Sequence, residues 1–139
     1  MQTALIAVVL LPALGALING LRAFLVPHAP KNRTITKAVA LGATFLSALI
    51  ATVFVVLPFV KTGEAQQFSY YEWIPAGIGT VGSQIANFSI DLAFRVDPLS
   101  CTMLMIVTWI GFLIHVYATG YMSHETGFTR FFTYLNLFM

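Results

Sequence analysis

Three long runs of apolar residues give the chain its main pattern. Residues 4–21, 38–60 and 99–122 contain no Asp, Glu, Lys or Arg. As helices they would be about 27 to 36 Å long, at ~1.5 Å per residue, and the hydrocarbon core of a bilayer is ~30 Å thick. We therefore expect three transmembrane helices. A signal peptide is disfavoured for the first run because no positive charge precedes it and Arg22 follows it.

The segment between the second and third runs has a different hydrophobic periodicity. From Phe88 to Asp97, apolar and polar residues alternate strictly, which is typical of a half-buried strand. The aromatic-rich residues 68–74 are compatible with a second strand. We expect an antiparallel β-hairpin, with its turn supplied by Gly77, Gly79 and Gly82.

The ends of the third run carry two further signals. Asp97 can accept a backbone N–H as a helix N-cap, and Pro98 suits the first helical turn. After Arg130 only nine residues remain, about 14 Å of helix, so residues 128–139 predict only the start of a fourth helix. The expected fold is an all-α membrane protein with three transmembrane helices, an incomplete fourth, and an outer-face β-hairpin between helices 2 and 3.

Three regions follow from these elements. Residues 1–60 hold two transmembrane helices joined by a basic loop, residues 61–97 hold the hairpin, and residues 98–139 hold the third helix and the incomplete fourth. Whether the chain is truncated, split or partial is open on the sequence alone.

Composition and charge place these regions relative to a membrane. Apolar residues make up 58% of the chain and charged residues only 9%, against about 25% charged in soluble domains, so an integral membrane protein is expected. Residues 22–37 carry four basic and no acidic side chains, which predicts a cytoplasmic or matrix location. Residues 61–97 carry two basic and four acidic side chains, consistent with the outer side. The amino terminus is then outside and residues 123–127 are inside.

The third run holds one ionisable residue, His115. Cys101, Thr108, His115 and Met122 recur at intervals of seven, so they share one helix face. Small and weakly polar residues on one face usually contact other helices. Two interpretations of His115 stay open: a member of a proton path, or a neutral histidine that bonds a facing helix and serves packing.

Chemistry of soluble enzymes is not indicated. The sequence has no Gly-rich phosphate loop after a strand, no metal-ligand spacing and no pairing of a nucleophile with a base. The single cysteine, Cys101, excludes a disulfide within the chain. We predict no catalytic, cofactor-binding or metal-binding residues in this chain; His115 and the cap Asp97 are its only candidate residues.

Four segments resemble a known family. They are Asp97-Pro98-Leu99-Ser100, Gly111-Phe112-Leu113-Ile114-His115-Val116-Tyr117, Gly120-Tyr121-Met122 and Arg130-Phe131-Phe132-Thr133-Tyr134-Leu135-Asn136-Leu137-Phe138. They closely resemble subunit L, or chain 5, of proton-pumping NADH-quinone oxidoreductase (respiratory complex I). The resemblance covers essentially the whole chain but only the amino-terminal part of the family's protein.

The resemblance implies an antiporter-like membrane-arm subunit in a complex that couples NADH:quinone electron transfer to proton translocation. It implies that NADH, flavin, iron–sulfur clusters and quinone are used on other subunits. The implied partners are other membrane-arm subunits and the lipid bilayer, with no nucleic acid. The implied location is the bacterial inner membrane or the mitochondrial inner membrane. The glutamate and lysines that are key in this family lie on later helices and match no residue here.

Two other functions stay open. The large subunit of a multisubunit cation/proton antiporter shares the architecture without the redox arm. A membrane fragment that packs without transporting anything is the third possibility.

Overall fold

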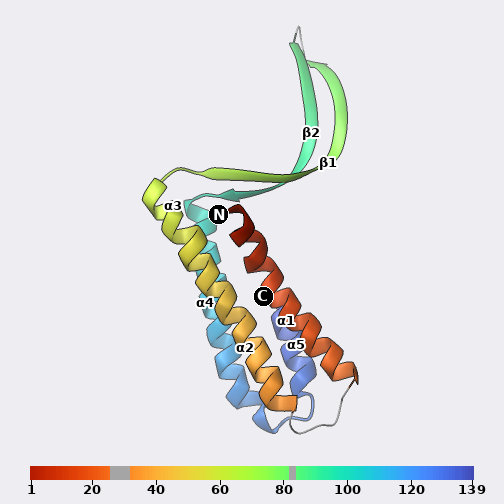
Figure 1. The fold of residues 1–139 in the computed structure, drawn as a ribbon, viewed down its shortest axis with the longest axis vertical. Coiled ribbons are helices and arrows are strands. Elements are labelled where there is room, and N and C mark those ends of the chain that lie inside the picture. Colours follow the sequence, from red (N-terminus) through yellow and green to blue (C-terminus); the bar gives the residue numbers. More distant parts are fainter. Residues whose placement is uncertain (26–31, 82–83) are drawn as a thin grey trace.

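The computed structural model describes residues 1–25, 32–81 and 84–139, with the side chains of residues 32, 75–81 and 84–88 left undescribed. Long helices run side by side in a bundle, and a two-stranded hairpin projects from one end of it (Figure 1). The four principal helices are α1 (Gln2–Leu25), α2 (Asn32–Ile50), α4 (Pro98–Tyr121) and α5 (Phe128–Phe138).

The second apolar run continues past α2 in a modified helical form. A π-helical segment, Ala51–Val56, follows α2 and leads into α3 (Leu57–Thr62). Pro58 lies in the first turn of α3 and has no N–H to donate to the preceding turn, which is a common cause of such irregularities. Gly63 ends α3 with φ 69°, a left-handed conformation that glycine adopts without a Cβ clash.

Small residues line the face of the second helix that points into the bundle. One hydroxyl on this face, Ser47 Oγ, donates to the Val8 carbonyl oxygen of α1 over 2.8 Å. Small side chains allow helix backbones to approach closely, which is the usual way of packing helices in lipid. The fully buried members of this face are Thr36, Ala40, Thr44, Ser47, Ala48 and Ala51.

Two apolar clusters hold the ends of the bundle. The cluster at the hairpin end is formed by Leu5, Val55, Phe59, Val96 and Cys101. The cluster at the opposite end is formed by Ala40, Ala118, Phe128 and Phe132. The interior of the bundle also holds buried polar side chains, among them Ser47, Thr108 and His115.

The predicted hairpin is confirmed, but β1 extends further than expected. Strands β1 (Gln66–Val81) and β2 (Gln84–Val96) pair antiparallel. Gly77 and Gly79 belong to β1 instead of the turn, and the backbone of Gly79 pairs with that of Ala86. A register shift between Pro75 and Ile78 lets the ladder continue past these residues. Gly82 lies outside the described residues.

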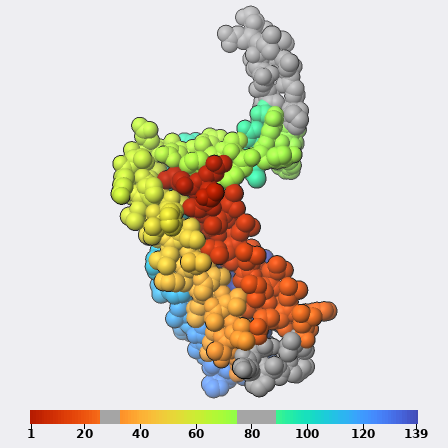
Figure 2. Space-filling model, viewed as in Figure 1, coloured from red at the N-terminus to blue at the C-terminus, as the bar shows by residue number. Residues whose placement is uncertain are grey.

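The expected half-burial of β2 applies only at its base. Val96 is 2% exposed within the cluster at the hairpin end, whereas Ile90 and Leu92 are 42% and 57% exposed. The alternating pattern was correct for a strand, but burial also needs a second layer, and the bundle reaches only the base of the hairpin. Tyr70 secures that base by donating from its hydroxyl to the Gln2 carbonyl oxygen, and strand residues lie against the start of α1 (Figure 2).

The predicted membrane spans are confirmed as helices. Among the described residues, three helices are by length and composition able to cross a bilayer: Gln2–Leu25, Arg33–Thr62 and Pro98–His124. α5 has 11 residues, about 16 Å of helix, and does not reach across. The chain is an integral membrane protein. The start of α2 and the turn between α4 and α5 lie at one end of the bundle, and the hairpin lies at the other (Figure 1).

This arrangement makes the membrane topology testable. Glu64, beside the hairpin, and Thr126, in the α4–α5 turn, are both exposed and lie at opposite ends. Cysteines introduced at these positions, one at a time in a Cys101→Ala background, should react with an impermeant maleimide from opposite faces. We expect Glu64→Cys to react from the outer face and Thr126→Cys only after permeabilisation. Reaction of both from one face would refute the topology.

Candidate functional site in the helix bundle

His115 is buried in the centre of the α4 face that contacts the other helices. Its side chain is 1% exposed, and Cys101 and Thr108, which precede it at intervals of seven, are 6% and 3% exposed. Phe132 of α5 packs beside it, with ring centroids 6.3 Å apart. The residue therefore faces protein and not lipid.

Both ring nitrogens of His115 have partners at short distance. Nδ1 lies 2.7 Å from the carbonyl oxygen of Gly111, one turn earlier in α4. Nε2 lies 2.7 Å from Oδ1 of Asn136 in α5. A backbone carbonyl only accepts, so Nδ1 carries a hydrogen and donates to it. Nε2 is the nitrogen at which a proton can be gained or lost.

Asn136 is the functional candidate that sequence reasoning missed. It is 1% exposed, and within the described part of the chain its Nδ2 has no hydrogen-bond partner. Gly15 of α1 lies directly against it, since a Cβ on Gly15 would be 2.7 Å from Nδ2. The available signal was an asparagine inside an apolar run, because buried amides at membrane depth usually bond across helices.

A second buried amide lies one turn along α1 from Gly15. Asn19 is 0% exposed, and its Nδ2 donates to the Thr36 carbonyl oxygen over 3.4 Å. The hydroxyl of Thr36 is 3.4 Å from that of Thr129 at the start of α5. Polar groups thus line the α1–α2–α5 contact near the end of the bundle that carries the α4–α5 turn.

The charges of the bundle lie at its ends. α1, α2, α4 and α5 contain no acidic residue, and the nearest cation on α5, Arg130, is six residues or ~9 Å along the axis from Asn136. A positive charge on His115 would therefore have no carboxylate partner in these helices. Burying an unpaired charge at membrane depth is costly.

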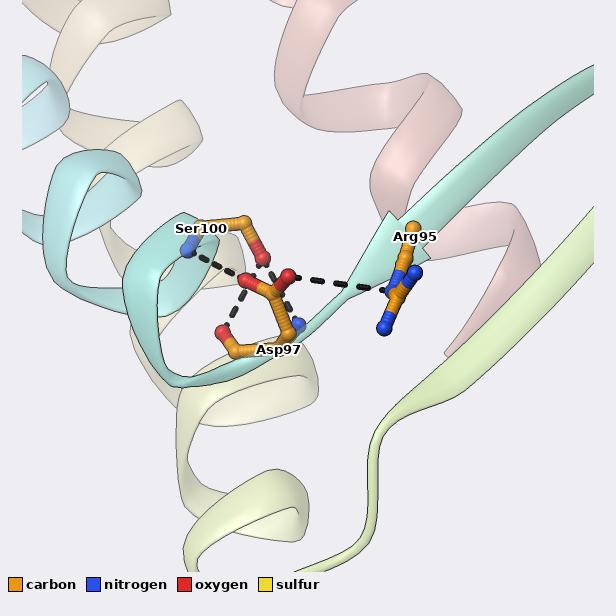
Figure 3. A network of polar contacts seen from close by, with 3 residues as sticks. All are labelled: Arg95, Asp97 and Ser100. Carbon is orange, nitrogen blue, oxygen red and sulfur yellow. Dashed lines mark hydrogen bonds and ion pairs between the residues drawn. The ribbon is translucent and has the colours of Figure 1, made fainter.

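Asp97, the other candidate, is the N-cap of α4 and precedes the third membrane-spanning helix. Its Oδ1 accepts from the Ser100 backbone N–H over 2.7 Å, and Ser100 Oγ accepts from the Asp97 N–H over 2.8 Å (Figure 3). Arg95 Nε lies 3.7 Å from Asp97 Oδ2. Asp97 precedes His115 by 18 residues, about 27 Å of helix, so the structure does not bring the two together.

The cap makes α4 sensitive to acid. Hydrogen bonds from Ser100, with a smaller contribution from Arg95, hold the pKa of Asp97 below its usual value. A lowered folded-state pKa means that the carboxylate stabilises the fold above the unfolded-state pKa of about 3.9. That stabilisation is lost as the pH falls through the folded-state pKa.

We expect Asp97→Asn to lower the unfolding midpoint at neutral pH and Asp97→Ala to lower it further, because asparagine still caps. The difference between the original chain and Asp97→Asn should vanish in strong acid. Thermal unfolding of the chain in detergent across a pH series measures this. A difference between them that is independent of pH would contradict the assignment of the effect to the carboxylate.

Comparison with known proteins decides the family. A profile described as "NADH-Ubiquinone oxidoreductase (complex I), chain 5 N-terminus" matches residues 83–132, which include Asp97 and His115. The chain is 39% identical over 108 residues, 78% of its length, to NADH-quinone oxidoreductase subunit L of Escherichia coli. This chain belongs to the complex I chain 5 (subunit L) family.

More distant members of the chain 5 family align over nearly the whole chain. Subunit L of Rickettsia bellii is 31% identical over 96% of it, and the chloroplastic NAD(P)H-quinone oxidoreductase subunit 5 of Zygnema circumcarinatum is 33% identical over 93%. The chain spans only 16 to 18% of the length of these relatives, and it corresponds to the amino-terminal portion of the family. Among the residues that the structure describes, no group of three His, Cys, Asp or Glu side chains could hold a metal ion.

Proposed function

We propose that this chain is the amino-terminal part of an antiporter-like membrane-arm subunit of NADH-quinone oxidoreductase. In this proposal it contributes to coupling NADH:quinone electron transfer to proton translocation, in a bacterial or mitochondrial inner membrane. Membership of the chain 5 family and three membrane-spanning helices support it. Its partners would be other membrane-arm subunits, and the electron carriers would sit on other subunits.

The observation that supports a role for a particular residue is the burial of His115. An ionisable side chain at membrane depth is costly to keep and is a functional candidate for that reason. Its Nε2 lies 2.7 Å from a side chain of another helix, and its Nδ1 is held by a carbonyl of its own helix. We propose that His115 holds a translocated proton at Nε2 during part of the cycle.

Two substitutions in the complete subunit test this role. In His115→Gln, the amide can still bond Asn136 but does not titrate near neutral pH. We expect normal amounts of assembled complex and a lowered number of protons translocated per electron. In His115→Leu, the partner amide is left unbonded, at a cost of about 1 to 3 kcal/mol, and the amount of assembled complex should fall too.

The outcomes separate the two roles that the sequence left open. Normal pumping by an assembled His115→Gln complex would reject the proton-holding role and leave a packing histidine. Proton translocation is measured by quenching of a pH-sensitive dye in inverted vesicles, normalised to NADH oxidation and to complex quantified on native gels.

A related expectation concerns the chain by itself. The 139-residue polypeptide should neither pump protons nor transfer electrons, because its membrane-spanning helices contain no acidic residue to pair with a lysine, and no cofactor ligands are evident in its sequence. Liposomes that contain only this polypeptide should show the proton permeability of lipid alone. Flux above that level that is abolished by His115→Gln would refute the expectation.

A further inference from the structure

We propose that Asn136 is a positioning residue that accommodates both charge states of His115 by turning its side-chain amide through half a rotation. The inference rests on the proton-holding role proposed above for His115. It assigns to α5 a residue that responds to the presence of the proton, although Asn136 itself does not titrate.

Donor and acceptor counting leads to this conclusion. As placed, His115 faces two acceptors, the Gly111 carbonyl oxygen at Nδ1 and Asn136 Oδ1 at Nε2, each at 2.7 Å. Two acceptors require hydrogens on both nitrogens, so this arrangement fits the charged imidazolium. The neutral ring has only one N–H hydrogen. It lies on Nδ1 and is donated to the Gly111 carbonyl oxygen, so Nε2 becomes an acceptor and needs a donor. A half rotation of the amide brings Nδ2 to Nε2 and supplies that donor.

The surroundings of the amide are compatible with either orientation. On the side away from His115, Nδ2 has no partner in the described part of the chain, so no hydrogen bond opposes the rotation. The neighbour on that side is Gly15, which leaves space where any other residue would place a Cβ 2.7 Å from Nδ2. In the rotated form, Nδ2 gains the bond to Nε2, and Oδ1 takes its place as the amide atom without a partner among the described residues.

The charges on every element packed around the pair favour a return to the neutral form. α4 carries no charge within its length, and α1, α2 and α5 present only cations, all in the first or last two turns at the end with the α4–α5 turn. Those cations are Arg22, Arg33, Lys37 and Arg130. Because α1, α2, α4 and α5 contain no acidic side chain, and the nearest one in the chain order, Glu125, lies in the α4–α5 turn, the imidazolium gains little from these helices except the Asn136 oxygen. The amide oxygen of Asn136 is therefore the group that stabilises the protonated His115 ring.

Two substitutions of Asn136 in the complete subunit should move proton translocation in opposite directions. Asn136→Asp places a carboxylate at Nε2 and favours the protonated ring, so the alkaline limb of the pH profile should move upward by about 1 to 3 pH units. Asn136→Leu removes the acceptor, so the same limb should move downward by about one unit. Protons translocated per electron, measured across pH in assembled complex, is the readout.

Asn19→Leu is the matched control. Asn19 is another fully buried asparagine of the bundle, and its described bond is to the Thr36 backbone instead of to His115. The Asn19→Leu substitution should lower the amount of assembled complex as Asn136→Leu does, and leave the alkaline limb of the pH profile unshifted. An equal shift in Asn19→Leu, or an unmoved limb in assembled Asn136→Asp complex, would overturn the proposal. If His115→Gln lowers pumping while both Asn136 profiles stay unchanged, His115 keeps its role and only the role of Asn136 fails.

A spectroscopic measurement on the unaltered complex is independent of how well the variants assemble. Infrared difference spectra between acid and alkaline pH should contain a side-chain amide carbonyl change that titrates together with an imidazole band. Labelling with asparagine that carries ¹⁵N in its side chain should shift that change, and His115→Gln should abolish it. Absence of the amide change from the unaltered complex would refute the rotation.

Discussion

Phe132→Ala should give the largest loss of stability of any single substitution in the bundle. Phe132 is 0% exposed, and its ring centroid lies 4.7 Å from that of Phe128 and 5.5 Å from that of Phe131. Truncating a buried phenylalanine costs about 3 to 5 kcal/mol in soluble proteins. In a bilayer the loss comes from packing and not from transfer out of water, so we expect about 3 kcal/mol.

The control for this substitution lies on the same helix. Phe138 is 90% exposed, so Phe138→Ala removes the same atoms without opening a cavity. The loss of helicity of the 139-residue chain during SDS titration should occur at a clearly lower SDS fraction for Phe132→Ala and at an unchanged fraction for Phe138→Ala. Equal midpoints for the two variants would show that the Phe128–Phe132 cluster does not hold α5 in place.

Gly15→Ala should be the second most damaging change, although it adds a single methyl group. The new Cβ would lie 2.7 Å from Asn136 Nδ2 and 2.9 Å from the Cβ of Ala43. The amide could turn aside, but Ala43 moves only with the backbone of α2, so two helices must separate. Overpacking of this kind costs about 1 to 3 kcal/mol.

Gly42→Ala provides the comparison for Gly15→Ala. Gly42 is a helical glycine with nothing within 4 Å of the position of an added Cβ, so alanine should leave stability unchanged or raise it by up to about 1 kcal/mol. The SDS midpoint and the amount of assembled complex are the measurements. A Gly15→Ala protein as stable as Gly42→Ala would mean that α1 does not pack against Asn136 as described.

Features that depend on neighbouring residues in the sequence could be predicted. The helix start at Asp97 depends on Ser100 three residues on, and the membrane spans depend only on length and polarity. The interval of seven from Cys101 to His115 correctly indicated the face that contacts other helices, because helix geometry fixes which residues share a face.

Features that depend on residues distant in the sequence could not be predicted. Asn136 became a candidate only when the fold placed its amide beside a residue 21 positions earlier. Gly77 and Gly79 were wrongly assigned to the turn of the hairpin because glycine is compatible with a turn and also with a bulged strand. The exposure of Ile90 and Leu92 likewise depends on how far the bundle extends beneath β2, which the alternating pattern cannot specify.

The contact that Arg33 makes with the α4–α5 turn bears on the order in which the protein is built. Its guanidinium group donates to the carbonyl oxygens of Ser123 and Glu125, which follow it by 90 and 92 residues. Because the ribosome delivers the amino terminus first, Arg33 is already in the membrane when these carbonyls emerge. The first pair of helices thus provides a ready docking point that fixes where the third span stops. A defect at Arg33 should therefore appear during biogenesis, as a misplaced third span, before it appears as a loss of activity.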